Sequence, residues 1–201
     1  MIATSTWSDA LDLLGLDGVI QGLSLRSGSG GICGRAMTVK ESIGEYESAD
    51  FIPADFLDAI EPEVFLIVDS GGAAISTFGG LAAFTAVRRG VAGVAIDGAC
   101  RDLEEIRGSG LWLASKHVTP RSGKRRIRVE SVNVPVVFCG ITISPGDFIA
   151  GDETGIIRIP AARFEEAVAI AEELTLRDAQ FAEEIRQGQT FRAASSKLGH
   201  V

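Results

Sequence analysis

Runs of consecutive apolar residues alternate along this chain with segments whose apolar residues recur every three or four positions. Two of the runs, EVFLIVD at 63–69 and VAGVAI at 91–96, have the length and β-branched content of buried strands. A segment with helical periodicity or a helix-start signal follows each run. The pattern therefore predicts two successive strand–turn–helix units, 64–89 and 91–107, with parallel strands.

Shorter elements surround these two units. A helix is predicted after Ser8-Asp9, and a longer helix from Pro160 to about Ile185. The other predicted strands lie at 36–40, 111–118, 132–138, 141–144, 148–150 and 156–159. Loops are predicted at 16–30 and 41–50, a helical turn or two within 51–60, and a loosely held tail after Gly188. The chain is thus expected to be one α/β domain over residues 1–190 with a C-terminal tail, 191–201.

The segment between the second strand and its helix carries the strongest candidate chemistry. Asp97-Gly98 is a turn-forming dipeptide, and Arg101, Asp102 and Glu105 follow it. One interpretation is a helix start in which Asp102 is the cap and Glu105 completes a capping box. The other is an anion-binding arginine beside a metal-binding carboxylate, at the strand end where open α/β proteins bind ligands. The two interpretations are compatible, and the local sequence favours neither.

A second candidate lies at the start of the helix predicted over 78–87. Gly79 and Gly80 would leave backbone N–H groups open to a carboxylate, where the helix dipole favours negative charge. The alternative is that the two glycines only permit a tight turn and close packing. Because parallel strands end at one edge of a sheet, Gly79-Gly80 and Arg101-Asp102 are expected at the same edge.

Composition and charge narrow the class of protein. The 201 residues carry a formal charge of −8, which disfavours a nucleic-acid binder. There is no uninterrupted apolar segment long enough to span a membrane, and the first ten residues lack the features of a secretory signal. The three widely spaced cysteines (Cys33, Cys100, Cys139) indicate a reducing compartment, so a cytoplasmic location is expected.

The residues available for binding sites are limited in kind. With only His117 and His200, a histidine-rich metal centre is disfavoured, and any metal is expected to be a hard cation held by oxygen. The glycines at 28–34 resemble a phosphate loop, but they precede a strand and no Lys-Ser/Thr follows, so a flexible loop is favoured. The one basic cluster, 121–128, is interpreted first as a solvated hairpin or subunit contact, and second as a clamp for a polyanionic substrate.

Several motifs resemble one known family. Gly80, twenty intervening residues and then Arg101-Asp102-x-x-Glu105 is similar to the signature of the class II pyruvate aldolases related to the regulator of ribonuclease activity A. The motifs SDAL, GRAMTV, VDSGG, FGGLA, GVAGVAIDGACRD, VNVPV, ISPGD and GDETGIIRIP occur in the family's order. The resemblance covers roughly residues 5–190. These aldolases cleave 4-hydroxy-4-methyl-2-oxoglutarate or 4-carboxy-4-hydroxy-2-oxoadipate, and they decarboxylate oxaloacetate.

The resemblance implies a fold, an assembly and a site. The fold would be an α-β-β-α sandwich of the swivelling-domain kind, assembled as a homotrimer or homohexamer. Asp102 would hold Mg²⁺ or Mn²⁺, Arg101 would contact the 2-oxo acid substrate, and the main chain at Gly79, Gly80, Leu81 and Ala82 would hold the pyruvate carboxylate. Many aldolase members carry Asp, Glu or Asn at the position of Gly80, so this chain departs from their pattern there. Asp178 is a candidate for reaching a neighbour's site.

The residues fit this chemistry without the resemblance. Cleavage of a 2-oxo acid forms a pyruvate enolate, which a divalent cation stabilises as a Lewis acid. Arg101 keeps its proton and suits an enolate or carboxylate oxygen, while one aspartate is the sparse ligation that Mg²⁺ accepts. Arg101 and Asp102 are therefore the expected catalytic residues.

Three rivals remain. A Schiff-base aldolase would use Lys40 or Lys116, which lie in apolar strand contexts. Cys100 beside Arg101 suggests a thiol nucleophile, but a buried inert thiol is favoured because no histidine is nearby. The third rival is a non-catalytic regulator that binds a ribonuclease or helicase, since the fold alone does not decide function. Retention of Arg101, Asp102 and Glu105 together favours the enzyme.

Overall fold

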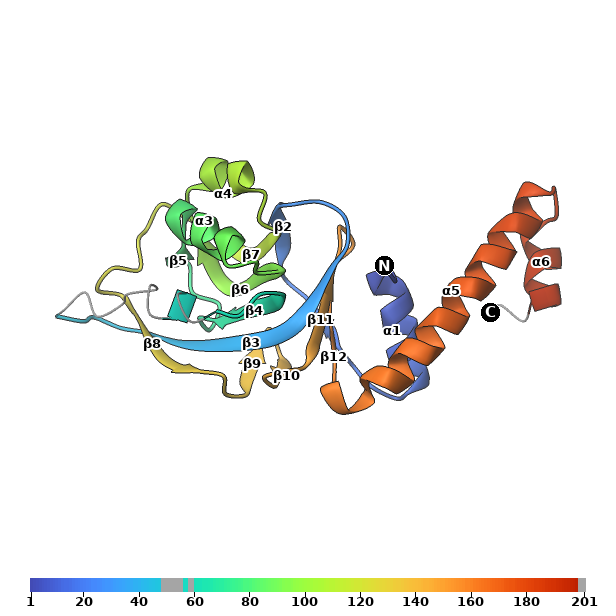
Figure 1. The fold of residues 1–201 in the computed structure, drawn as a ribbon, viewed down its shortest axis with the longest axis horizontal. Coiled ribbons are helices and arrows are strands. Elements are labelled where there is room, and N and C mark those ends of the chain that lie inside the picture. The colour runs from blue at the N-terminus through green and yellow to red at the C-terminus, as the bar shows by residue number, and fades with distance from the viewer. Residues whose placement is uncertain (48–55, 58–59, 199–201) are drawn as a thin grey trace.

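A long, curled, mixed sheet forms the body of the molecule, and helices cover parts of it (Figure 1). The computed structural model describes residues 1–47, 56–57 and 60–198. Within these residues one sheet has the strand order β1-β12-β11-β3-β4-β6-β7-β2, with β5 paired to β6 and β8 to β3, and β9 and β10 form a separate hairpin. The mixed α/β fold that the sequence predicts is thereby confirmed.

The elements have the following bounds. The strands are β1 (Val19–Ile20), β2 (Ser24–Ser27), β3 (Ile32–Ile43), β4 (Val64–Asp69), β5 (Ser76–Phe78), β6 (Gly93–Cys100), β7 (Leu113–Val118), β8 (Ile127–Val132), β9 (Val136–Phe138), β10 (Ile141–Ile143), β11 (Phe148–Gly151) and β12 (Ile156–Ile159). The helices are α1 (Thr4–Leu13), α3 (Gly80–Arg88), α4 (Leu103–Ser109), the short 3-10 turn η1 (Ala161–Arg163), α5 (Phe164–Arg186) and α6 (Phe191–Leu198). The helical turn predicted within 51–60 falls mostly outside the described residues.

Four parallel strands, β3, β4, β6 and β7, make the centre of the sheet. Helices α3 and α4 lie on one face and the β9–β10 hairpin on the other (Figure 1). Side chains alternate between these faces: Leu66 packs on the helical side, whereas Phe65 and Ile67 pack on the hairpin side. Burial on both faces explains the uninterrupted apolar runs. The two predicted strand–turn–helix units are confirmed.

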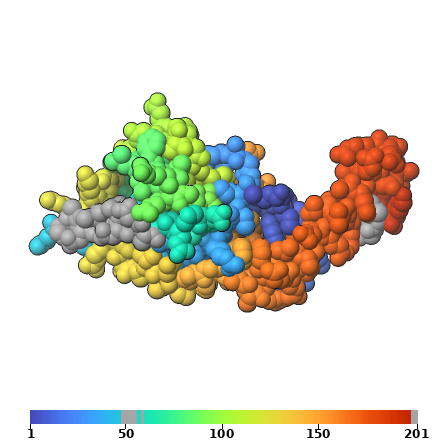
Figure 2. Space-filling model, viewed as in Figure 1, coloured from blue at the N-terminus to red at the C-terminus, as the bar shows by residue number. Residues whose placement is uncertain are grey.

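A third cluster joins the two ends of the chain. Helices α1 and α5 pack together against β11 and β12, with Trp7, Phe148 and Phe164 in ring contact. The C-terminal part of α5 and helix α6 stand away from the body of the molecule (Figure 2). Residues 191–198, expected to be loosely held, form a helix that contacts α5 through Phe181 and Phe191.

Three other expectations are corrected. The segment 16–30 contains β1 and β2, which pair with β12 and β7. The segment 41–50 begins as the end of β3, so Glu41 is a buried strand residue and not part of a solvated loop. Strand β6 continues through Asp97-Gly98 to Cys100. Gly98 serves packing there and not a turn, because a Cβ at this position would lie 2.9 Å from Ser70 Oγ.

Candidate functional site

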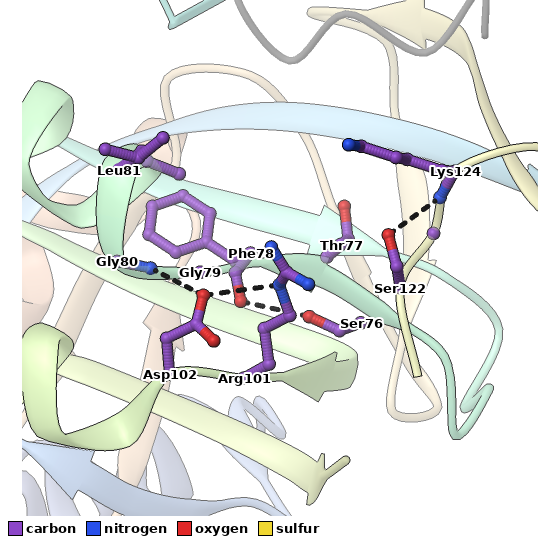
Figure 3. A pocket seen from close by; sticks show the side chains of 12 residues that line it. Ser76, Thr77, Phe78, Gly79, Gly80, Leu81, Arg101, Asp102, Ser122 and Lys124 are labelled. Carbon is purple, nitrogen blue, oxygen red and sulfur yellow. Dashed lines mark hydrogen bonds and ion pairs between the residues drawn. The ribbon is translucent and has the colours of Figure 1, made fainter. Parts of the chain in front are cut away.

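A pocket of about 180 Å³ lies where β5 and β6 end and helix α3 begins. It is lined by residues 76–82, by Arg101 and Asp102, and by residues 122–124 (Figure 3). All six residues predicted for the site, Gly79, Gly80, Leu81, Ala82, Arg101 and Asp102, are among them. The structure thus brings the two predicted segments together at one edge of the sheet, while the roles of the residues stay predictions.

The backbone turns sharply at Asp102 and directs its carboxylate toward the pocket. Asp102 stands at the N-cap of α4 in the left-handed region, with φ 56° and ψ 47°, and its side chain makes no capping hydrogen bond. Its Oδ2 instead accepts the Gly80 N–H at 3.3 Å and lies 3.2 Å from Arg101 Nε (Figure 3). The predicted capping box of Asp102 and Glu105 is therefore wrong. An uncommon backbone conformation of this kind points to a functional constraint.

Both glycines of the pocket give room to carboxylates. A Cβ at Gly79 would lie 2.6 Å from Asp102 Oδ2, and one at Gly80 would lie 2.3 Å from Glu105 Oε2 and 2.7 Å from Glu105 Cβ. Glu105 thus fills the space that a side chain at position 80 would take. The site prediction did not include Glu105, although its spacing from Asp102, about one helical turn, indicates that both carboxylates lie near one helix end.

The first turn of α3 supplies backbone donors. The helix begins with Ala83 N–H donating to the Gly79 carbonyl at 3.0 Å, so the amides before it have no partner within the helix. Arg101 is held at the same edge, because its backbone N–H donates to the Phe78 carbonyl at 2.9 Å. The amides of the first turn of α3, the dipole of that helix and the Arg101 guanidinium all favour an anion at this edge.

The basic segment contributes one side chain to the pocket. Lys124 is exposed and lines it together with Ser122, whose Oγ accepts the Lys124 N–H at 3.2 Å. Arg121, Arg125 and Arg126 line a separate depression instead. Lys124 was predicted only as part of the cluster; its place in the pocket depends on a bridge between Ser76 and Ser122 that local sequence does not signal.

The lysines proposed for a Schiff base lie elsewhere. Lys40 Nζ pairs with Asp69 at 2.6 Å and Lys116 Nζ with Asp97 at 3.0 Å, and neither lysine lines the pocket. The hydrogen bond to Asp97 raises the pKa of Lys116, whereas a Schiff-base amine needs a lowered pKa. Cys100 is buried, and burial raises the pKa of its thiol, as expected for an inert cysteine.

The metal donors of the site are few. Among the described residues there is no group of three or more His, Cys, Asp or Glu side chains that could share an ion. Asp102, whose side chain is 35% exposed, lines the pocket, and Glu105 lies beside Gly80. Asp178 lies on α5, which contributes no residue to the pocket.

In the described part of the chain no helix has the length and hydropathy needed to cross a membrane.

Comparison with known proteins places the chain in a family. The family model described as RraA-like, Aldolase/RraA, matches residues 4–158. The chain belongs to this RraA-like family.

Individual relatives agree with this assignment. The chain is 30% identical to Protein DlpA of Legionella pneumophila over 93% of its own length, and it spans 31% of that protein. It is 36% identical to a 4-hydroxy-4-methyl-2-oxoglutarate aldolase of Thermus thermophilus over 47% of this chain and 58% of that protein. An uncharacterized protein from Pseudomonas syringae has a similar structure, with a TM-score of 0.86, 28% identity, and coverage of 96% of this chain and 92% of that one.

Proposed function

We propose that this protein is a divalent-metal-dependent lyase. It cleaves a 4-hydroxy-2-oxo acid of the 4-hydroxy-4-methyl-2-oxoglutarate type to pyruvate and a second 2-oxo acid, and it decarboxylates oxaloacetate. The observation that carries the proposal is the Asp102 carboxylate, turned into a pocket beside Arg101 and the amides at Gly80. The aldolase among the relatives supports the same reaction class.

The donor set fits Mg²⁺ or Mn²⁺. Asp102 offers a hard, partly exposed carboxylate oxygen, and Glu105 stands close enough to Gly80 to serve the same region. Mg²⁺ is commonly bound through one or two carboxylates, with substrate and solvent completing its ligands. When bound, the cation would act as a Lewis acid toward the keto and carboxylate oxygens of the substrate.

The chain's own residues position and polarise the substrate. The amides at the start of α3 hold the carboxylate of the pyruvate unit. Breaking the bond between C3 and C4 moves its electron pair onto that unit as an enolate, and C4 becomes a ketone as the 4-hydroxyl gives its proton to solvent. The enolate then takes a proton from solvent at C3 and becomes pyruvate. Arg101, whose Nε lies against Asp102, offers the N–H donors of its other guanidinium nitrogens to the oxygen that becomes negative.

Lys124 extends the proposal to the far end of the substrate. It lines the same pocket as Arg101 but comes from a separate loop (Figure 3). A substrate of this class carries a second carboxylate beyond the bond that breaks. The ammonium group of Lys124 at the pocket rim suits that carboxylate. In this proposal one residue of the basic cluster, and not the whole cluster, binds the substrate.

Assembly into a homotrimer or homohexamer belongs to the same proposal. Leu81, Phe84 and Val87 on the outer side of α3 are 85%, 51% and 43% exposed, and Leu81 also lines the pocket. An exposed apolar helix face beside a binding site favours contact with another copy of the chain. Native mass spectrometry tests this: a monomer at micromolar concentration would reject the assembly.

The reaction is tested by pyruvate release from oxaloacetate and from 4-hydroxy-4-methyl-2-oxoglutarate, with and without Mg²⁺. Turnover is expected only with the metal, and Asp102→Ala is expected to abolish it without unfolding the protein. Glu104→Gln, which removes an exposed charge from the same helix, is the matched control. Trapping of pyruvate by borohydride, or activity in a strong chelator, would instead indicate the Schiff-base route.

A non-catalytic regulator is the second candidate, because the family description joins aldolases with RraA. A regulator would bind a ribonuclease or helicase through its surface, so Asp102→Ala would leave that binding intact. Wild-type protein without turnover on either substrate, but with such binding, would favour the regulator.

A further inference from the structure

Glu41 is a buried carboxylic acid beside the segment that leads into the pocket. It lies on β3, is 3% exposed, and pairs across the sheet with Val129 of β8. Its Oε2 accepts the hydroxyl of Ser70 at 2.5 Å, and its Oε1 accepts the hydroxyl of Thr77. The two hydroxyl groups belong to the two ends of the crossover between β4 and β5.

The electrostatic setting of Glu41 differs from that of the other buried acids. Asp69 and Asp97 are each paired with a lysine, whereas the described partners of Glu41 are neutral hydroxyls. Burial raises the pKa of Glu41 to about 7; the hydrogen bonds from Ser70 and Thr77 oppose that shift, and the charge of Asp69 adds to it. With no cation among its described partners, a buried carboxyl is costly to ionise, which makes Glu41 a candidate for a specific role.

The hydroxyls that Glu41 holds belong to residues beside the pocket and in its wall. Ser70 is fixed at one end of the crossover, where its N–H donates to the Asp97 carbonyl at 3.1 Å. Thr77, at the other end, is 8% exposed and forms part of the pocket wall. Phe78 and Gly79 follow Thr77 and lead into the first turn of α3, whose amides are the proposed anion donors.

We propose that Glu41 is a positioning residue for the pocket, acting through Ser70 and Thr77 on the β4–β5 crossover and on β5, which leads into the amides at the start of α3. The inference rests on the proposed function, because those amides are taken to bind the pyruvate carboxylate. The cation, in contrast, is assigned to Asp102 on the β6–α4 connection. Loss of Glu41 therefore weakens binding of the 2-oxo acid and leaves binding of the metal intact.

The test measures two affinities by calorimetry: Mn²⁺ alone, and pyruvate at saturating Mn²⁺. Glu41→Leu is expected to raise the Kd of pyruvate about tenfold or more, because the segment that leads into the α3 amides loses both hydrogen bonds to Glu41. The Kd of Mn²⁺ is expected to change less than about twofold. Glu41→Gln, which can still bond to both hydroxyls, restores most of the pyruvate affinity.

Two further variants separate positioning from general destabilisation. Ser70→Ala removes one of the two hydrogen bonds to Glu41, and Ser70 does not line the pocket. This variant is also expected to weaken pyruvate binding, and it provides the test if Glu41→Leu does not fold. Thr38→Val is the control. Thr38 lies on β3 like Glu41, but its buried hydroxyl donates to the Val134 carbonyl at 2.6 Å and not to the segment that leads into the pocket. It should leave both affinities unchanged.

The outcomes distinguish this inference from the proposed function. If wild-type protein binds pyruvate with Mn²⁺ and both Glu41→Leu and Ser70→Ala bind it equally well, Glu41 has no positioning role. Equal weakening by Thr38→Val would overturn the inference in the same way. Wild-type protein that binds neither Mn²⁺ nor pyruvate would reject the proposed function and the inference with it.

Discussion

Asp97 and Asp102 lie close together in the chain but in different surroundings. Asp97 is on β6, its side chain is 8% exposed, and it holds Lys116 at 3.0 Å and the Cys139 N–H at 3.4 Å. Asp102 follows the strand, is 35% exposed, and shares the pocket with Arg101. Both have a cationic neighbour, so charge pairing alone does not mark a site. Asp102 differs from Asp97 in that it lines a pocket and has a left-handed backbone conformation.

The largest effect is expected at Asp102. Asp102→Asn should lower kcat for oxaloacetate decarboxylation by about a thousandfold, because losing the metal removes several kcal/mol of transition-state stabilisation. The melting temperature should change by no more than about 2 °C, since the side chain is partly exposed, makes no cap bond to α4, and holds the Gly80 N–H only at 3.3 Å. Steady-state kinetics and thermal unfolding measure the two effects, and a large loss of stability with retained turnover would make Asp102 a structural residue like Asp97.

Glu41 extends the comparison to a buried acid that has no cation among its described partners. Its pKa is raised from 4.5 to about 7, so the neutral form is favoured in the folded state. Its contribution to stability is full below pH 4.5 and is lost as the pH rises through about 7. Glu41→Gln cannot ionise, so its stability relative to wild type should improve between pH 5 and pH 8 by an amount on the order of 3 kcal/mol. Urea unfolding at both pH values measures this, and parallel stability curves would contradict it.

Removing the charge of Asp97 should affect stability and leave the chemistry intact. Asp97→Asn weakens the contact with Lys116, but that lysine is 38% exposed and can turn toward water. The expected loss is therefore about 1–2 kcal/mol in urea unfolding, below the usual cost of breaking a fully buried pair. Turnover per folded molecule should stay within about twofold. Abolished turnover in a folded Asp97→Asn protein would remove the distinction from Asp102.

The smallest effect is expected at Lys124. Lys124→Met should raise KM for a dicarboxylate substrate about fivefold, which corresponds to about 1 kcal/mol for an exposed charge pair. Pyruvate, which lacks the second carboxylate, should inhibit the variant and the wild type equally. An increase in the inhibition constant of pyruvate would assign Lys124 to the pyruvate end of the pocket instead.

Much of the fold could be predicted because it depends on long apolar runs. Strands such as β4 are buried on both faces, and strict burial leaves a clear pattern. Asp97-Gly98 was misread because the pair is common in turns, while here Gly98 gives room to Ser70 and the strand continues. Glu41 was misread because acidic segments are usually solvated, and its hydroxyl partners come from distant parts of the chain.

The candidate site could be predicted in part for a topological reason. Gly80 and Asp102 belong to consecutive strand–turn–helix units, and parallel strands bring such positions to one edge. Thr77 and Lys124 could not be found in this way. Their places depend on the pairing of β5 with β6 and on the bridge between Ser76 and Ser122, which follow from the register of the folded sheet and not from local pattern.

The most direct test of the account is a calorimetric titration of Mn²⁺ into wild-type protein and into Asp102→Asn. The wild type should bind the cation with a stoichiometry of one per chain, and the variant should bind it at least about a hundredfold more weakly, because the carboxylate is the proposed main protein ligand. Equal binding by the two proteins would show that the cation, if one is used, is held elsewhere.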